Sequence, residues 1–390
     1  MPKLSLNSLV YAVNPFRVFN RFVSLERDLE NYFSFGSKMR IGMDIGNYAI
    51  KTVLVKPVAE GYQLSNYAIK EVERPLDGPG EEIDEVAVTQ ALRELLSERH
   101  IKAKRVNLSI SDPSLYTRQI KVAKTKKDQL NRVIRQAAEK YIPFSIDEAI
   151  VDYQPIESLA HDSDEMEIFI VAAKKAMVQK YLTILHEVKL APNVMDISIF
   201  PATKLLADIY LQSQEAILPI VDIGHHSTTV AILNGSSLRF VRNFHTAGHH
   251  FTSAIASAQS IQEAEAEKIK RSADLYPGQG EAQSGRYDIR SQLEPVLNDF
   301  VGQIQRCFAY CERDFMIENI GKIIICGGGS LLKGLDRYLE ESLGVKIERG
   351  DPLQKVPAAM PPEDSAVLNE QKPVLCAALG LATCEFSRGQ

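Results

Sequence analysis

Two short segments of the sequence share a pattern of an apolar strand, an Asp-Ile-Gly turn and a second β-rich run. The first is centred on Asp44 and Gly46, and the second on Asp222 and Gly224. A glycine in such a turn lets backbone N–H groups converge on anionic oxygens without interference from a Cβ. An adjacent aspartate suits Mg²⁺, which is usually held by one or two carboxylates together with substrate phosphates. The pair therefore predicts a duplicated phosphate clamp, with Asp44 and Asp222 as metal-binding carboxylates.

The residues after each turn favour a hairpin. Residues 51–55 and 228–233 continue as strands, whereas a dinucleotide-binding G-x-G-x-x-G motif opens a helix. A single Asp-Ile-Gly turn is equally well explained as an ordinary hairpin turn. Its recurrence in the second half of the chain favours the phosphate-binding interpretation.

Two further motifs complete the candidate site. Residues 322–335 read as a buried strand, a glycine cluster and a helix, so the backbone there can lie flat against a planar base. Between the second and third motifs, Glu267 and Lys270 stand three positions apart on a helical stretch and share one face. They could reach a ribose and a base together, although such a pair taken alone is more typical of a solvated ion pair.

In this order, the four motifs resemble those of the actin, Hsp70 and sugar-kinase superfamily, whose two RNase-H-like lobes close on ATP. Within it, the chain is similar to the PilM family of type IV pilus assembly proteins, relatives of the division protein FtsA, over about residues 40–386. The specific marks are the segments 138–144, 168–175, 304–306 with Tyr310, and 376–382. The motifs and the resemblance together imply that ATP or ADP with Mg²⁺ is bound by Asp44, Gly46, Asn47, Tyr48, Lys51, Asp222, Gly224, His225, Ser227, Thr228, Gly248, Glu267, Lys270, Gly327, Gly328, Gly329 and Ser330.

The resemblance also implies an α/β fold of two actin-like lobes closing on a nucleotide. The expected parts are an N-terminal extension of unassigned role (1–38), a first lobe core (39–111 and 193–216), an inserted FtsA/PilM-type (SHS2) subdomain (112–192), a second lobe core (217–258 and 319–390) and its helical insertion (259–318). Met39 is an alternative start of the protein. Residues 1–38 contain no apolar run of about 18 residues, so they predict no transmembrane helix, and they are too interrupted by polar residues for a signal peptide. The segment is expected to be a helix or arm docked on the lobe or a partner, with an amphipathic helix on a membrane surface as the alternative.

The function implied by the resemblance is that of a cytoplasmic ATP-binding scaffold of a type IV pilus, or type II secretion-like, inner-membrane platform. It would be peripheral to the membrane and grip the cytoplasmic tail of a PilN-like bitopic protein. The tail would lie between the first lobe and the inserted subdomain, beside Tyr141, Ile142, Pro143 and Phe144; alternatively these residues simply pack the subdomain. Other platform proteins and self-association are further expected contacts.

No catalytic residue is identifiable, and Ala247 stands where the family usually has a glycine, so a nucleotide switch with at most slow ATPase activity is expected. The alternatives are an FtsA-like filament-forming division protein and a small-molecule kinase or phosphatase of the same superfamily. A kinase would need a catalytic carboxylate in the cleft between the lobes.

Composition excludes several other classes. A net charge of −5 and the lack of a basic, aromatic-interleaved stripe argue against nucleic-acid binding. Five cysteines without a C-x-x-C pair predict reduced, buried thiols rather than disulfides or a zinc site. The doublets His225-His226 and His249-His250 are not expected to bind metal, because adjacent residues on a strand point to opposite faces.

Two helices are predicted from local signals. Asp84 suits an N-cap, and Leu92, Leu95 and Leu96 line one side of the stretch that follows, which predicts a helix to about Arg99. The apolar residues from Leu130 to Tyr141 recur at i, i+3, i+4, i+7, i+8 and i+11, which predicts an amphipathic helix in the inserted subdomain.

Overall fold

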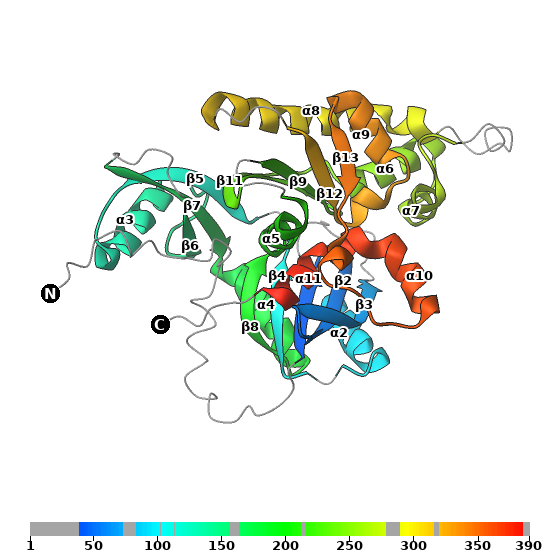
Figure 1. Ribbon diagram of the computed structural model, residues 1–390, viewed down its shortest axis with the longest axis horizontal. Coiled ribbons are helices and arrows are strands. Elements are labelled where there is room, and N and C mark those ends of the chain that lie inside the picture. The colour runs from blue at the N-terminus through cyan, green and yellow to red at the C-terminus, as the bar shows by residue number, and fades with distance from the viewer. Residues whose placement is uncertain are drawn as a thin grey trace.

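The computed structural model describes residues 39–72, 83–101, 103–112, 114–156, 164–211, 216–277, 289–315 and 320–384. The predicted N-terminal extension, 1–38, lies outside the described residues. Three sheets organise the chain (Figure 1). Two of them have five strands each, and the third has three.

The two five-stranded sheets have the same topology. The first has the order β3-β2-β1-β4-β8, formed by β1 (Arg40–Ile45), β2 (Ala49–Pro57), β3 (Tyr62–Glu71), β4 (Arg105–Ile110) and β8 (Ala191–Ile197). The second has the order β11-β10-β9-β12-β13, formed by β9 (Ile217–Ile223), β10 (Thr228–Asn234), β11 (Ser237–Phe244), β12 (Lys322–Cys326) and β13 (Lys346–Arg349). In each, three strands pair antiparallel and the last two join in parallel. The duplicated turn occupies the same place in both lobes, which confirms the predicted two-lobe architecture.

A three-stranded sheet forms the separate unit at one end of the molecule (Figure 1). Its order is β5-β7-β6, with β5 at Tyr116–Ala123, β6 at Ala149–Ile156 and β7 at Glu165–Lys174. Helix α3 (Lys127–Glu139) covers it, and the predicted stripe packs Leu130, Ile134 and Ala138 against Ile168 and Ile170. The stripe therefore encloses a small core of its own.

The limits of the inserted subdomain stay predictions, but packing favours an earlier end than 192. Helix α4 (Lys175–Glu187) lies against α2 (Glu85–Glu98) and β8 of the first lobe. Its Tyr181 is 1% exposed and belongs to the same core cluster as Met43. On this packing the three-stranded unit ends at Lys174.

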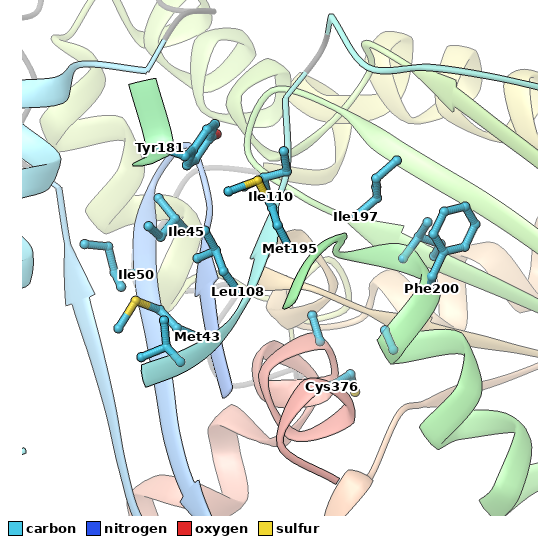
Figure 2. Packing of buried hydrophobic residues seen from close by; sticks show 14 of the residues in the cluster. Met43, Ile45, Ile50, Leu108, Ile110, Tyr181, Met195, Ile197, Phe200 and Cys376 are labelled. Carbon is cyan, nitrogen blue, oxygen red and sulfur yellow. The ribbon is translucent and has the colours of Figure 1, made fainter. Parts of the chain in front are cut away.

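Two helices lie between the five-stranded sheets. Helix α5 (Ile199–Tyr210) contacts β8, β9, β10 and helix α11 (Cys376–Thr383), and α11 packs on β1, β2 and β4. Close backbone approach requires glycine here, because a Cβ on Gly42 would lie 1.9 Å from the carbonyl oxygen of Ala378. The apolar core is continuous from β1 through α5 to α11 (Figure 2). Thus helix α11, predicted within the second lobe, lies on the sheet of the first.

The remaining helices sit mainly on the second lobe. Helix α6 (Gly248–Gln259) packs against α7 (Glu263–Ser272) and the long α8 (Ile289–Phe315). Helix α9 (Leu335–Leu343) lies between α8 and β13, while α10 (Pro362–Gln371) precedes α11. Among the described residues, none of the helices is both long and apolar enough to cross a membrane.

Candidate functional site

Asp44 lies next to the end of the first strand, and both of its carboxylate oxygens accept hydrogen bonds. It is 5% exposed, and its Oδ2 accepts a hydrogen bond from Lys51 Nζ at 2.9 Å. Its Oδ1 accepts from Ser109 Oγ at 2.8 Å and from Ser198 Oγ at 2.7 Å. The two serines were not predicted from the sequence. Ser109 is brought there by the parallel register of β4 with β1, and Ser198 by the start of α5.

Asp222 is the equivalent residue of the second lobe and has a different environment. Among the described residues it has no side-chain hydrogen bond or ion pair, and burial together with the Asp44 carboxylate raises its pKa to about 6, partly offset by Lys51. A Cβ on Gly327 would lie 2.3 Å from Asp222 Oδ1. Because Asp44 contributes to this shift, the two carboxylates lie close enough to repel each other. A hard divalent cation with oxygen ligands fits this donor set, because it would offset their repulsion.

The two predicted phosphate turns close alike. Gly46 N donates to Ala49 O at 3.2 Å, and Gly224 N donates to Ser227 O at 3.0 Å. Asn47 and Tyr48 lie within the first turn, and His225 within the second. In each lobe the turn therefore projects beyond the strand ends beside its aspartate.

The second turn is also held against helix α6. Gly248 N donates to Gly224 O at 3.1 Å, and Thr228 Oγ1 donates to Thr246 O at 2.8 Å. Ala247, which stands in place of the family's glycine, is fully buried. These bonds fix the start of α6 beside the turn.

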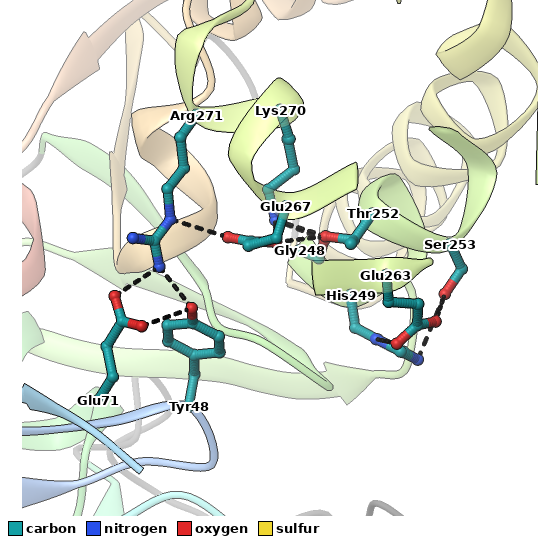
Figure 3. Close-up of polar contacts among 10 residues, drawn as sticks. All are labelled: Tyr48, Glu71, Gly248, His249, Thr252, Ser253, Glu263, Glu267, Lys270 and Arg271. Atoms are coloured by element: carbon teal, nitrogen blue, oxygen red, sulfur yellow. Dashed lines mark hydrogen bonds and ion pairs between the residues drawn. The ribbon is translucent and has the colours of Figure 1, made fainter. Parts of the chain in front are cut away.

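Glu267 and Lys270 form a partly buried pair rather than a solvated one (Figure 3). Lys270 Nζ lies 2.6 Å from Glu267 Oε2 and donates to Thr252 Oγ1 at 2.8 Å and Gly248 O at 3.1 Å. Burial lowers the pKa of Lys270, although Glu267 opposes the shift. The pair is thus tied to the first turn of α6, and Thr252 is a contributor that the sequence did not single out.

Arg271 extends this network across to the first lobe (Figure 3). It reaches Glu71 at 2.8 Å and Tyr48 Oη at 2.5 Å, as well as Glu267 at 3.1 Å. Tyr48 Oη donates in turn to Glu71 at 2.9 Å. Burial and the carboxylates of Glu71 and Glu267 raise the pKa of Tyr48, while Arg271 lowers it. We call the residues Tyr48, Glu71 and Arg271 the interlobe clasp.

The glycine cluster approaches the second-lobe turn closely. Gly327 has φ +81°, and a Cβ on Gly329 would lie 2.4 Å from Ile223 Cγ2. Gly328 has open space where its Cβ would be, and Ser330 Oγ donates to Gly327 O at 2.7 Å. The cluster therefore presents bare backbone on one side and touches the strand end of Asp222 on the other.

A small cavity of about 30 Å³ lies where both lobes meet the inserted unit. It includes Asp222 and Ser227 of the predicted site, and Asp112, Thr117 and Asn243 from neighbouring segments. Asp112 already accepts hydrogen bonds from the backbone and hydroxyl of Ser114. The cavity joins the predicted nucleotide site to the seam between the inserted unit and β11.

The four residues of the predicted partner-binding turn differ in how far they are buried. Ile142 is 7% exposed and packs with Ala149 and Ala172, while Phe144 is partly buried beside them. Tyr141 is 39% exposed, with Arg118 over its ring at 4.4 Å, and Pro143 is exposed. Ile142 and Phe144 thus pack the subdomain, whereas Tyr141 and Pro143 are available at its surface.

The strand argument used for the histidine doublets does not hold for the first of them. His225 and His226 lie in the bend between β9 and β10, not on a strand, so strand alternation does not apply to them. Their ring centroids are 4.4 Å apart, and that of His249 lies 4.9 Å from His226. The structure thus gathers three rings that the sequence argument had separated.

The comparisons agree with the fold. A family model described as type IV pilus assembly protein PilM matches residues 42–386. This chain belongs to the PilM family. A chain of a solved PilM–PilN type IV pilus biogenesis complex is 27% identical, with a TM-score of 0.76 over 88% of this chain and 97% of that chain.

Two other solved structures share the fold alone. MreB 5 of Spiroplasma citri bound to AMPPNP is 14% identical, with a TM-score of 0.51 over 88% of this chain and 95% of that one. The ethanolamine utilization protein EutJ from Carboxydothermus hydrogenoformans is 16% identical, with a TM-score of 0.50 over 90% of each chain. Membership of the PilM family favours pilus assembly over the division-protein and kinase alternatives.

Proposed function

We propose that this PilM-family protein is a cytoplasmic, ATP-binding component of a type IV pilus inner-membrane platform, peripheral to the membrane through its partners. The observation that carries the nucleotide proposal is the convergence of Asp44 and Asp222 from equivalent turns of two equivalent sheets. Burial and repulsion from Asp44 raise the pKa of Asp222, and a bound cation would oppose this shift. A nucleotide carrying its own divalent ion suits this pair.

The residues present divide the work of binding. Backbone N–H groups of the two turns would bind phosphates, and Asp44 and Asp222 would hold Mg²⁺, which when bound neutralises phosphate charge. The bare backbone at Gly328 offers a flat surface for the base. Glu267 and Lys270 would bind the ribose or the base. Each side chain would then contact the ligand in addition to, or in place of, its ion-pair partner. ADP is proposed as the second ligand of the same site.

Calorimetry with Mg-ATP tests the nucleotide site. Asp222→Ala and Asp44→Ala should each weaken binding by at least about 10-fold, which is about 1.4 kcal/mol. Asp336→Ala is the matched control, because Asp336 is an ion-paired aspartate of the second lobe, bonded to Arg349. Unchanged affinity in both site variants would overturn the proposal. Phosphate release should stay below about 1 s⁻¹, the low end of enzyme turnover.

For the partner, we propose that the cytoplasmic tail of a PilN-like protein binds beside the exposed Tyr141 and Pro143. The PilM-family relative described above was solved with PilN. An extended tail could also pair with a free edge of the three-stranded sheet, because main-chain hydrogen bonds give affinity in such complexes. The two edge strands of that sheet are β5 and β6.

Point variants test the partner better than deletion of 112–192, because α4 and β8 belong to the first-lobe core. Tyr141→Ala should weaken binding of a PilN-like tail peptide at least about 10-fold by fluorescence anisotropy. Tyr276→Ala is the matched control, since Arg290 lies 4.4 Å from the centroid of the Tyr276 ring on the second lobe, just as Arg118 lies over Tyr141. An Arg242→Gln variant tests the other candidate surface, the seam between the inserted unit and β11. Loss of peptide binding in that variant alone would place the partner site at this seam.

A further inference from the structure

Three imidazoles converge beside the second-lobe turn. His225 and His226 come from the bend between β9 and β10, and His249 from the first turn of α6. One nitrogen of each ring lies within 4.8 Å of the corresponding atoms of the other two. The rings are partly buried, which leaves them accessible to an ion.

The backbone holds these three residues together independently of their side chains. His249 N donates to His225 O at 2.7 Å, and the preceding residue, Gly248, donates to Gly224 O at 3.1 Å. A Cβ on Gly248 would lie 3.0 Å from Gly224 O, so the helix start fits tightly against the turn. The three imidazoles are therefore carried on two backbone segments that are hydrogen-bonded to each other.

We propose that His225, His226 and His249 form a binding site for a divalent transition-metal ion of the Zn²⁺ class. Neutral imidazole is a preferred ligand of Zn²⁺, Cu²⁺ and Ni²⁺, and three protein ligands leave the fourth tetrahedral position for water or an anion. Tetrahedral ligand nitrogens about 2.0–2.1 Å from zinc would lie roughly 3.4 Å apart. Rotation of the partly exposed rings closes the distance from the present upper limit of 4.8 Å.

The surroundings of His249 support a ligand role. Its Nδ1 lies 3.7 Å from Glu263 Oε2, and its Nε2 lies 3.4 Å from Ser253 Oγ (Figure 3). Ser253 Oγ itself donates to Glu263 Oε1 at 2.6 Å. A carboxylate next to a metal-binding imidazole fixes its orientation and raises its basicity. Glu263 is placed to do this for His249.

This site is chemically distinct from the carboxylate pair at Asp44 and Asp222. Carboxylate and phosphate oxygens suit Mg²⁺, whereas three imidazole nitrogens favour zinc-class ions. His225 stands between Asp222 and Ser227 in the sequence of the turn, so the proposed metal site lies beside the region where we propose phosphates bind. The metal proposal itself does not depend on nucleotide binding.

Metal titration of the full, untagged chain after chelator treatment tests the site. Calorimetry with Zn²⁺ should give one ion per chain, and Co²⁺ should give the visible absorption of a tetrahedral nitrogen site. His226→Gln and His249→Gln should each weaken Zn²⁺ binding at least about 100-fold, and Glu263→Gln about 10-fold. His245→Gln is the matched control: its histidine is exposed, near in sequence and outside the cluster, so binding should not change.

Two results would overturn the proposal. One is a wild-type protein that takes up no Zn²⁺ at micromolar concentrations, and the other is equal uptake by wild type, His226→Gln and His249→Gln. ATP titrations of the same preparations with Mg²⁺ report separately on the nucleotide site. Failure of one function is therefore distinguishable from failure of the other.

Discussion

The two lobes share a sheet order and a turn motif, yet their equivalent aspartates differ in their hydrogen-bond partners. Asp44 receives three hydrogen bonds, from Lys51, Ser109 and Ser198. Asp222 receives none from side chains of the described residues, and burial and Asp44 raise its pKa to about 6. In a symmetric pair, both carboxylates would have hydrogen-bond donors, or neither would. The asymmetry leaves one fixed anion and one carboxylate whose charge becomes favourable when a cation binds.

The largest expected effect comes from removing each charge in turn. A folded-state pKa of about 6, against 3.8 as the ordinary value, means that ionising Asp222 opposes folding increasingly from pH 4 to pH 6. The full effect is about 3 kcal/mol. Asp222→Asn should therefore raise the free energy of unfolding at pH 7, without metal or nucleotide, and change it little at pH 4.

Asp44→Asn should act in the opposite direction. It removes the charge that faces Lys51 and turns an amide donor toward an ammonium or a hydroxyl, which should lower the free energy of unfolding by about 2 kcal/mol. Denaturant titrations at pH 4 and pH 7 measure both variants. Shifts of the same sign in the two variants at pH 7 would break the comparison between the lobes.

The glycine cluster sharpens the comparison, because the second lobe packs Gly327 and Gly329 against its own aspartate turn. Gly327→Ala should lower the free energy of unfolding by about 2 kcal/mol, since φ is +81° and the added Cβ meets Asp222 and Ile223 O. Gly328→Ala is the matched control, as nothing lies within 4 Å of its Cβ position. Thermal melts that rank the two variants equally would contradict this account.

The smallest effect is expected at the interlobe clasp. Arg271 is 49% exposed, so Arg271→Gln should lower the free energy of unfolding by about 0.5–1 kcal/mol, and less in high salt. Arg337→Gln is the control, because its ion pair with Glu341 lies within one helix. If the clasp joins the lobes, Arg271→Gln should also increase hydrogen exchange at the β1–β2 turn, whereas Arg337→Gln should not.

Local signals predicted the elements that depend on nearby residues. The helix from Asp84 was predicted almost to the residue, because Asp84 Oδ1 accepts from Val86 N and Ala87 N and a leucine stripe follows. The duplicated hairpins were found because each motif contains both of its strands. Family resemblance then supplied the pairing of the two lobes, which no local pattern contains.

The sequence by itself determined the two Asp-Ile-Gly turns, the glycine cluster and the elements that carry them, because hydrogen bonds within a few residues and apolar periodicity fix such features. Only the tertiary structure decided which distant groups surround them. Ser109 and Ser198 reach Asp44 through sheet register and the position of α5, and α11 lies on β1 after crossing from the other lobe. The histidine cluster likewise arises because the β9–β10 bend and the start of α6 are hydrogen-bonded to each other, a contact that spacing alone does not encode.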